Sequence, residues 1–456
     1  MRDHERSHVH FVGMGGIGMS GLARVLLERG HRVSGSDLKL SALTDKLAAL
    51  GATVYEGHRS EQVAGAELVV ISSAVPLDNP EVVEARRRGI PVLKRAEMLG
   101  RLMAEKYSIA VAGTHGKTTT SAMIALILER AGLDPTVLVG GELMDLGTNA
   151  KLGQGEYLVA EADEFDGSFL KAVPRLAVVT NIEADHLDYY GSLEAIVEAF
   201  GQFIALVPPD GYVVLCQDDP KVRDLGGTEG TVVTYGLGQG AEWRATDLRL
   251  NGRGGYDFVV WHGEAQLGPF SLGVPGRHNV TNALAAIVVA WLLGLDVDQV
   301  RGTLARYRGT RRRFEVKGVV RGVTVVDDYA HHPTEIRATL AAARERYPGQ
   351  ALWVVFQPHT YSRTRFLLDD FARAFDQADH LVVTAIYAAR EHDDLGISSA
   401  DLVARMSHPH VRHIADLREA ATYLAHRIRP GDVLLTLGAG DVWRVGEEVL
   451  AILRER

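Results

Sequence analysis

The sequence is poor in cysteine and lacks a long apolar run. Its 456 residues include one cysteine, Cys216, so no internal disulfide can form. Cys216 lies in the apolar run YVVLC, which predicts a buried thiol rather than a nucleophile. The longest apolar stretch is ALAAIVVAWLLGL at 283–295. It falls short of the ~18 residues that a membrane span requires, so we expect a buried helix there.

Long blocks of one charge are also absent. The formal net charge is −9 and no extended basic segment occurs, which argues against a general nucleic-acid binder. The N-terminal stretch MRDHERSHVH is polar, carries both signs of charge and has no apolar signal-peptide core. We therefore expect a cytoplasmic protein without a membrane span, whose partners are small molecules rather than nucleic acid.

What the sequence does contain is a repeated alternation of short β-branched runs with longer stretches rich in Ala, Leu, Glu and Arg. Examples of the runs are HVHFV, YSIAVAG, LAVVTNI and DVLLTLGAG. This alternation is typical of α/β folds with parallel sheets and helices on their faces. Three series of such units predict three domains, at 1–106, 107–312 and 313–456, a number that also suits the length.

The first motif is FVGMGGIGMSG, in which Gly13, Gly15 and Gly18 match the dinucleotide fingerprint G-x-G-x-x-G. A predicted strand precedes it and a predicted helix follows it. Asp37 ends a second short run, near the place of a ribose-binding acid. On its own, this motif predicts a pyrophosphate site and favours an NAD-dependent oxidoreductase.

A second loop, AVAGTHGKTTT, changes that interpretation. Backbone N–H groups around Gly113 and Gly116 can surround phosphate oxygens, Lys117 adds a charge, and the Thr118 hydroxyl can bind Mg²⁺. The strict P-loop has a glycine where this chain has Val111. An NAD dehydrogenase does not need this second loop, so the two loops together predict two nucleotide-like ligands.

Acidic residues follow the next two predicted strands. EYLVAEADEFDG supplies Glu161, and LAVVTNIEADHLDYYG supplies His186 among further acids. Mg²⁺ prefers carboxylate oxygens, so Glu161 is a candidate metal ligand. Most of these acids fit solvated loops or helix caps equally well, and imidazole is an unusual ligand for Mg²⁺.

The remaining motifs leave more alternatives open. Asn279 and Asn282, three residues apart at the start of a predicted helix, fit an adenine edge or simple N-capping. The arginines of TRRRFE fit a solvated face, or one of them fits a γ-phosphate. DDYAHHPTEI and QPHTYSRT place His and Arg side chains after strands, where Arg suits a carboxylate or phosphate. A zinc site is not expected, because adjacent histidines seldom share one ion.

Taken in order, GMGGIGMSG, AGTHGKTTT, EADEFD, TNIEADHLD, GRHNVTNALAA, RRRFE, DDYAHHPTE and QPHTYSRT resemble the motifs of the Mur ligases over nearly the whole chain. The resemblance implies a Rossmann-like domain that binds a UDP-sugar, a P-loop ATPase-type central domain, and a Rossmann-like C-terminal domain that brings an amino acid. The implied reaction joins L-alanine to the lactyl carboxylate of UDP-N-acetylmuramate through an acyl phosphate, with ATP and Mg²⁺, in peptidoglycan precursor synthesis.

The resemblance also implies roles for individual residues. The UDP-sugar would contact Gly15, Gly16, Ile17, Gly18, Ser36, Asp37, His58 and Ser73. ATP would contact Gly113, Thr114, His115, Gly116, Lys117, Thr118, Thr119, Asn279, Asn282, Arg313 and Asp328. The metal ligands would be Thr118, Glu161 and His186, and the amino acid and the muramoyl carboxylate would lie near Tyr329, His332, His359 and Arg363. Lys117, His186, Arg313 and His332 would serve catalysis, with the general base left open between the two histidines.

Three alternatives remain at this point. A recycling ligase would add a preformed tripeptide to the same UDP-sugar. An NAD-dependent oxidoreductase would use the first loop and leave the second unexplained. A non-catalytic sensor would keep the binding loops without needing the acids and arginines. The sequence leaves open whether the chain is a monomer or a dimer.

Overall fold

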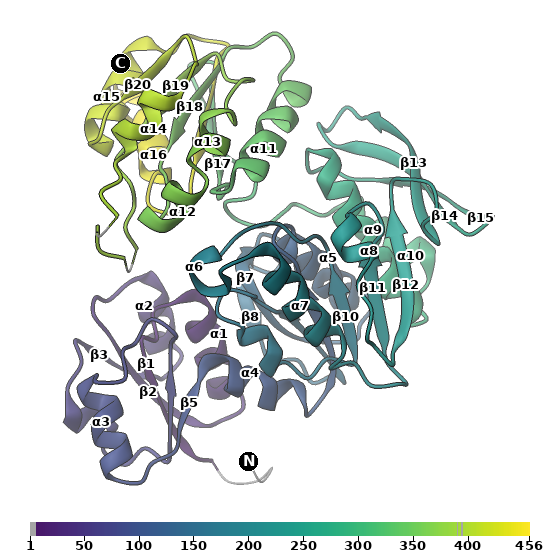
Figure 1. Cartoon of the computed structure of the whole chain (residues 1–456), viewed down its shortest axis with the longest axis vertical. Coiled ribbons are helices and arrows are strands. Elements are labelled where there is room, and N and C mark those ends of the chain that lie inside the picture. The colour runs from purple at the N-terminus through teal and green to yellow at the C-terminus, as the bar shows by residue number, and fades with distance from the viewer. Residues whose placement is uncertain (1–5, 390, 394) are drawn as a thin grey trace. The chain divides into compact units, whose positions relative to one another are not determined.

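The computed structural model describes residues 6–389, 391–393 and 395–456. The chain divides into two compact units, each made of several segments, and each is described by itself. Figure 1 labels the helices and strands. The first unit comprises Met1–Ile182, Glu194–Trp243 and Ala285–Thr303. The second comprises Glu183–Leu193, Arg244–Leu284 and Leu304–Arg456.

The first sheet of the first unit is parallel and has the order β3-β2-β1-β4-β5. Its strands are β1 (His8–Val12), β2 (Arg32–Asp37), β3 (Thr53–Glu56), β4 (Leu68–Ile71) and β5 (Val92–Lys94). Its helices are α1 (Ile17–Glu28), α2 (Ala42–Ala49), α3 (Pro80–Arg87) and α4 (Arg95–Met103), with a short 3-10 turn η1 (Ser60–Val63). The strand order reverses between β1 and β4, and ligands of such sheets bind at the carboxyl ends of the strands at this switch point.

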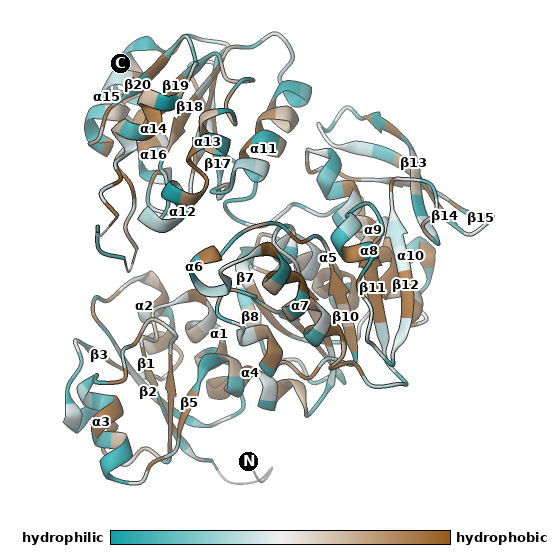
Figure 2. Cartoon of the chain, in the orientation of Figure 1, coloured by the Kyte–Doolittle hydropathy of each residue, from teal (hydrophilic) through white to brown (hydrophobic). Residues whose placement is uncertain are grey.

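The strands that the first unit contributes to the second sheet have the order β12-β11-β10-β6-β9-β7-β8. All neighbouring strands are parallel except β7 and β8. The strands are β6 (Tyr107–Ala112), β7 (Thr136–Leu143), β8 (Thr148–Lys151), β9 (Tyr157–Glu161), β10 (Leu176–Val179), β11 (Tyr212–Cys216) and β12 (Thr231–Gly236). The accompanying helices are α5 (Lys117–Arg130), α7 (Leu193–Ile204), α8 (Pro220–Arg223) and the 3-10 turn η2 (Ser168–Lys171). Strands β10 and β11 are largely hydrophobic, as parallel strands covered on both faces require (Figure 2).

After β12, the chain continues with β13 (Trp243–Leu250) and the antiparallel pair β14 (Tyr256–His262) and β15 (Ala265–Ser271). Helices α9 (Arg277–Leu292) and α10 (Val297–Leu304) follow. Helix α9 ends three residues before the apolar stretch does, and Ala283–Ala290 is buried throughout. The predicted buried helix is therefore confirmed. Cys216 is buried at the end of β11, and burial raises the pKa of its thiol to about 11, which agrees with an inert thiol.

The sheet of the second unit has the order β16-β17-β21-β18-β19-β20, and β16 alone is antiparallel to its neighbour. Its strands are β16 (Glu315–Val320), β17 (Val323–Asp328), β18 (Leu352–Phe356), β19 (His380–Val383), β20 (Val411–His413) and β21 (Val433–Leu437). Its helices are α11 (Pro333–Arg346), α12 (Tyr361–Phe366), α13 (Leu368–Ala372), α14 (Ser399–Arg405), α15 (Leu417–Arg427) and α16 (Trp443–Glu455). One apolar core joins this sheet to α11, α13 and α14, and another joins it to α15 and α16. The sheet is thus covered on both faces, as the α/β prediction requires.

Within the described residues, no helix combines the length and the hydrophobicity that crossing a bilayer would take.

Candidate active site

The glycine loop after β1 is held by the end of β2. The N–H groups of Gly13 and Met14 donate to the carbonyl oxygen of Ser36 at 2.9 and 3.0 Å. The N–H of Gly15 donates to the carboxylate of Asp37 at 2.8 Å. Gly13 has a φ of +79°, which favours glycine. Asp37 therefore shapes the loop itself, in addition to any contact with a ligand.

The other residues predicted for the UDP-sugar lie around this loop. Gly16, Ile17 and Gly18 stand at the N-terminus of α1, whose free N–H groups favour an anion. His58 follows β3, and its Nδ1 lies 2.9 Å from the Ser36 hydroxyl. Ser73 follows β4 and is exposed. Since β1 and β4 are neighbours, these residues gather at the switch point of the first sheet.

The phosphate loop follows β6 and is anchored to the neighbouring strand β10. The N–H of Thr114 donates to the carbonyl of Asn181 at 2.9 Å, and the N–H of His115 donates to the Asn181 side chain at 2.8 Å. Gly113 has a φ of +133°, and a Cβ there would overlap the Thr180 hydroxyl. Gly116 has a φ of +82° directly before α5. Both glycines are therefore required by the path of the loop, and Thr119 lies in the first turn of α5.

Lys117, the first residue of α5, points to a buried acid. Its Nζ lies 3.0 and 2.8 Å from the two carboxylate oxygens of Glu164 and donates to the carbonyl of Gly113 at 2.6 Å. Burial alone would lower the pKa of Lys117, but the carboxylates of Glu164, Asp163 and Glu161 outweigh burial and raise it. Burial also raises the pKa of Glu164 to about 7, against the effect of Lys117. Glu164 was not predicted to have a role of its own, although the motif EADEFD contains it.

Two residues predicted to bind metal also lie side by side. The Thr118 hydroxyl donates to a carboxylate oxygen of Glu161 at 2.9 Å, and the N–H of Gly140 donates to the same oxygen at 2.7 Å. A hydroxyl and a carboxylate are hard oxygen donors of the kind that Mg²⁺ prefers. The donor set of Thr118 and Glu161 therefore fits the ion that the sequence predicts.

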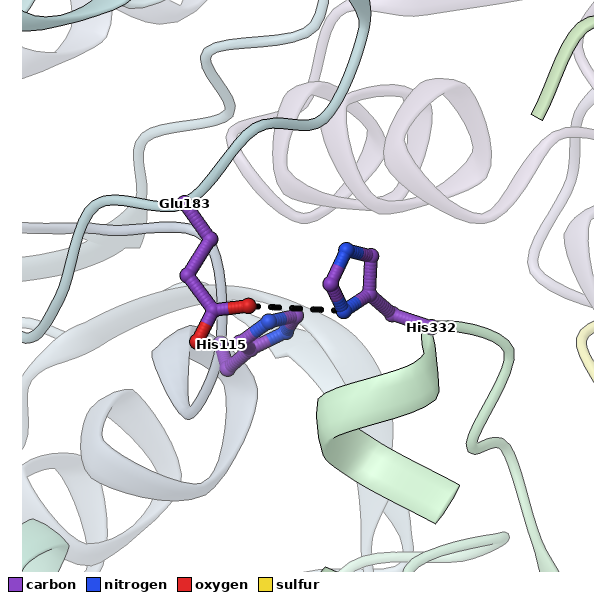
Figure 3. A group of neighbouring side chains, drawn as sticks. All are labelled: His115, Glu183 and His332. Atoms are coloured by element: carbon purple, nitrogen blue, oxygen red, sulfur yellow. Dashed lines mark ion pairs between the residues drawn. The ribbon is translucent and has the colours of Figure 1, made fainter. Parts of the chain in front are cut away.

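In the second unit, Nδ1 of His332 lies 3.5 Å from a carboxylate oxygen of Glu183, a contact that is an ion pair only when His332 is protonated (Figure 3). The Thr334 hydroxyl donates to the same Glu183 carboxylate at 2.7 Å. His332 is buried and caps the N-terminus of α11 by accepting from the Thr334 N–H. His332 is thus held in one orientation by its own helix and by Glu183.

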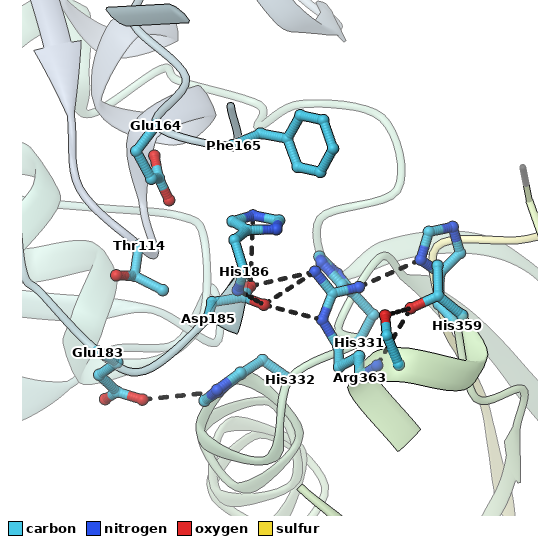
Figure 4. A network of polar contacts seen from close by, with 12 residues as sticks. Thr114, Glu164, Phe165, Glu183, Asp185, His186, His331, His332, His359 and Arg363 are labelled. Atoms are coloured by element: carbon cyan, nitrogen blue, oxygen red, sulfur yellow. Dashed lines mark hydrogen bonds and ion pairs between the residues drawn. The ribbon is translucent and has the colours of Figure 1, made fainter. Parts of the chain in front are cut away.

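Arg363 binds a carboxylate within the same unit. Its Nε and one terminal nitrogen each lie 3.1 Å from an oxygen of Asp185, and another nitrogen lies 3.2 Å from Nδ1 of His359 (Figure 4). Burial would raise the pKa of Asp185, but the Arg363 guanidinium outweighs it and holds the pKa well below its usual range. Arg363 therefore makes with Asp185 the two-point contact that a guanidinium offers a carboxylate, and its contact with a substrate carboxylate stays a prediction.

His186 and His331 flank this pair. His186 adopts a left-handed backbone with a φ of +54°, and its Nε2 lies 3.7 Å from Asp185. Burial lowers the pKa of His331 to about 3, so His331 is neutral near pH 7. Its Nδ1 donates to the carbonyl of Tyr329 at 2.9 Å.

Of the arginine run, Arg312 and Arg313 differ in their contacts. Arg312 pairs with buried Asp327 at 3.0 Å. Arg313 lies 3.7 Å from Glu335, and the guanidinium groups of both arginines are over the ring of Tyr329. Asp328, at the end of β17, accepts hydrogen bonds from the N–H groups of Phe314 and Ala330 at 2.7 and 2.8 Å.

The two asparagines are buried in the first turns of α9. The Asn279 amide donates to the carbonyl of Pro275 at 2.7 Å, and the Asn282 amide donates to the Asn279 side chain at 3.1 Å. In both bonds the side chain is the donor, whereas an N-capping side chain accepts from a backbone N–H. These contacts hold both amides in place and do not correspond to N-capping.

Three protein-family models match the chain. The family model described as "Mur ligase family, catalytic domain" matches residues 8–107, the "Mur ligase middle domain" matches 111–290, and the "Mur ligase, glutamate ligase domain" matches 312–440. The chain is 52% identical to the UDP-N-acetylmuramate–L-alanine ligase of Geobacter sp. (strain M21) over 98% of this chain and 97% of that protein.

Solved structures agree with these matches. The crystal structure of UDP-N-acetylmuramate–alanine ligase from Thermotoga maritima has a TM-score of 0.84 and 31% identity, covering 98% of this chain and 99% of that one. The murein peptide ligase of Psychrobacter arcticus 273-4 has a TM-score of 0.76 and 26% identity, covering 98% of both chains. The predicted three-domain α/β fold is confirmed by these similarities.

Proposed function

Since the chain belongs to the Mur ligase family, we propose that it is the ATP-dependent ligase that joins L-alanine to the lactyl carboxylate of UDP-N-acetylmuramate in peptidoglycan precursor synthesis. The observation that carries the proposal is the similarity, over nearly the full length, to relatives named for this reaction. The two phosphate-binding loops agree with it, because the UDP-sugar and ATP both present phosphates.

The reaction requires that a poor acyl electrophile be activated. A carboxylate oxygen of the muramoyl group attacks the γ-phosphorus of ATP, ADP leaves, and an acyl phosphate forms. Lys117 would hold the ATP phosphates and offset charge that spreads over the transferring oxygens. Arg313, if it exchanges its contact with Glu335 for the phosphates, would add a second positive charge. Asn279 and Asn282 would bind adenine and Asp328 the ribose.

Thr118 and Glu161 would hold Mg²⁺, with His186 as a candidate ligand for a second ion. Bound Mg²⁺ supplies electrostatic stabilisation to phosphoryl oxygens. The Thr118 hydroxyl oxygen and a Glu161 carboxylate oxygen lie 2.9 Å apart, close enough for both to be ligands of one ion.

The second step forms the amide bond. The neutral amine of L-alanine attacks the acyl carbon, the tetrahedral intermediate expels phosphate, and the amine proton passes to a base. Arg363 and His359 would bind a carboxylate, and Tyr329 and His332 would line the same region. His332 is a better candidate base than His186, since a metal-bound imidazole has no free lone pair.

Three further points belong to the proposal. The domain boundaries lie near residues 106 and 312. The protein works in the cytoplasm, where ATP is available. Its partners are small molecules, and its oligomeric state, monomer or dimer, stays open.

Two alternatives are disfavoured. The L-alanine ligase of Geobacter sp. (strain M21) is 52% identical to the chain, and the murein peptide ligase of Psychrobacter arcticus is 26% identical, which argues against a tripeptide substrate. An NAD-dependent oxidoreductase is not supported by the family matches, which place the first glycine loop in a Mur ligase domain.

Phosphate release with ATP, Mg²⁺ and UDP-N-acetylmuramate tests the proposal, with L-alanine, glycine, L-serine and the tripeptide compared as acceptors. We expect release to require the UDP-sugar and to be fastest with L-alanine. Omission of the UDP-sugar is the control. Preference for the tripeptide would establish the recycling ligase instead, and an absorbance change at the nicotinamide band would indicate the oxidoreductase.

A further inference from the structure

A chain of buried polar side chains runs through the first sheet behind the glycine loop. It belongs entirely to the first unit and links β1, β2 and the segment after β3 to α3. Its members are His8, His10, Ser34, Ser36, His58 and Glu81. Only Ser36 and His58 were predicted to contact a ligand, so the remaining members need another explanation.

Glu81 is the centre of this chain. It lies in the first turn of α3 and its side chain is fully buried. One carboxylate oxygen lies 3.0 Å from His10 Nε2. The other accepts from the Ser36 hydroxyl at 2.6 Å and lies 2.8 Å from His58 Nδ1. Across the described part of the chain, the ion pairs of Glu81 are formed with histidines and not with lysine or arginine.

The proton positions follow from counting donors, starting at His8. Its Nδ1 faces the carbonyl of Gly65 at 2.9 Å and must carry a proton. Burial lowers the pKa of His8, so the ring is neutral and Nε2 accepts. The partner of Nε2, at 2.7 Å, is the Ser34 hydroxyl, which therefore donates its one proton to His8. Ser34 must then accept from Nδ1 of His10, also at 2.7 Å.

His10 and Glu81 consequently share one proton between Nε2 and the carboxylate oxygen. The pair is either an imidazolium with a carboxylate or a neutral imidazole with a carboxylic acid, and it is neutral overall in both forms. The buried carboxyl group of Glu81 is tolerated without a lysine or arginine partner because its pair with His10 carries no net charge. The second oxygen of Glu81 remains an acceptor in either form.

The second carboxylate oxygen of Glu81 determines which ring nitrogen of His58 carries a proton. Because the Ser36 hydroxyl already donates its proton to Glu81, His58 Nδ1 must carry a proton and donate it to the same oxygen. Nε2 then keeps its lone pair. No partner for Nε2 is found among residues 6–389, 391–393 and 395–456, and the His58 side chain is 14% exposed. His58 therefore presents one defined nitrogen outward, next to the loop that Ser36 holds.

We propose that Glu81 is a positioning residue for the UDP-sugar: it fixes His58 through Nδ1–H, so that Nε2 faces the ligand as a hydrogen-bond acceptor. The acceptor suits a hydroxyl or N–H group of the nucleotide. The inference rests on the proposed function, which makes the first sheet the UDP-sugar site. Orienting partners of this kind act by fixing the tautomer and angle of the imidazole that touches the ligand.

A double-mutant cycle tests the proposal, with affinities for UDP and UDP-N-acetylmuramate measured by calorimetry. Glu81→Ala should weaken both ligands by about 10- to 100-fold, the range for one lost hydrogen bond to a charged or oriented group. His58→Ala should weaken them similarly. The double variant should be no weaker than His58→Ala, because Glu81 acts through His58.

Glu84→Gln is the matched control. Glu84 is on the same helix, and its carboxylate pairs with Arg87 and Arg88 instead of the buried chain. Its UDP affinity should equal that of the unmodified protein. The KM for ATP should be the same in all four variants, which separates positioning from a general loss of structure.

Nitrogen NMR of labelled histidine in the unmodified protein gives an answer even if Glu81→Ala does not fold. We expect His58 to carry its proton on Nδ1, with Nε2 unprotonated. Additive effects in the cycle, or a proton on Nε2 instead of Nδ1, would overturn the proposal. Failure of the proposed function would appear differently, as an unmodified protein that releases no phosphate with L-alanine.

Discussion

At the scale of single residues, Asp328 is a carboxyl group that the fold keeps from ionising normally. Burial raises its pKa to about 6 from 3.8, although Arg313 and the N–H groups of Ala330 and Phe314 oppose the shift. The unfolded chain thus loses this proton at lower pH than the folded chain does. Between about pH 4 and pH 6 the folded state binds more protons, so stability must fall as the pH rises through this window.

We predict that Asp328→Asn removes this part of the pH dependence. The shift of about two pKa units corresponds to at most ~3 kcal/mol between pH 4 and pH 7. Hydrogen exchange of the β17 amides, followed at several pH values, measures it locally. The protection lost between pH 4 and pH 7 should be smaller in the variant. Equal losses in both proteins would mean that Asp328 ionises normally in the folded state.

The local structure of the phosphate loop was predictable from the sequence. The glycines and Lys117 of the phosphate loop lie within one short stretch, so strand, loop and helix could be recognised together. The partners of the buried side chains could not be predicted. Glu164 is 47 positions from Lys117, and Glu81 is 71 positions from His10, so their pairing depends on which strands become neighbours. The signal for Glu81 was weak, since an acid in the first turn of a helix is ordinary.

At the scale of elements, we predict that alanine substitutions at two glycines within helices change the stability of the protein in opposite directions. Gly100 in α4 faces the backbone of η2, and a Cβ there would overlap the carbonyl oxygen of Lys171. A Cβ added at Gly201 in α7 would have no atom of the chain within 4 Å. Gly100→Ala should destabilise the protein by ~1–3 kcal/mol through forced repacking. Gly201→Ala should stabilise it by up to ~1 kcal/mol through helix propensity.

Calorimetric unfolding of both variants measures the difference. The melting temperature should fall for Gly100→Ala and rise slightly for Gly201→Ala. Each variant is the control for the other, since both make the same change within a helix of the first unit. A rise in both would show that α4 and η2 move apart without cost.

Elements with one continuous apolar run were the easiest to predict, although the alternating run HVHFV also predicted β1. The strands β6, β10 and β21 were recognised from YSIAVAG, LAVVTNI and DVLLTLGAG. The hairpin of β14 and β15 was missed. Buried positions alternate with more exposed ones in β14, whereas in β15 Phe270 is the buried position, and Gly268 and Pro269 weaken the strand signal.

At the scale of the whole molecule, strand order carried information that the sequence did not. The runs showed where strands begin, but the order β3-β2-β1-β4-β5 decides that His58, Ser36 and the glycine loop meet at one switch point. The order of the eight motifs along the chain nevertheless sufficed for the family. Such motifs stand at strand ends, and in parallel sheets these ends share one edge.

Because the glycine loop and the phosphate loop follow strands of two different sheets, their ligands should be separable by mutation. We predict that Lys117→Ala lowers the rate of L-alanine-dependent ADP release by about 100-fold or more, since a positioned positive charge is lost from the transferring phosphate. UDP-N-acetylmuramate affinity, measured by calorimetry, should stay within about twofold. Lys151→Ala is the control, because Lys151 ends β8, in the sheet whose strand β6 leads into the phosphate loop, and pairs with Glu129 and Asp134 instead. Full turnover by Lys117→Ala would refute the assignment of the ATP site, and a parallel loss of UDP-sugar affinity would show that the two sites are not independent.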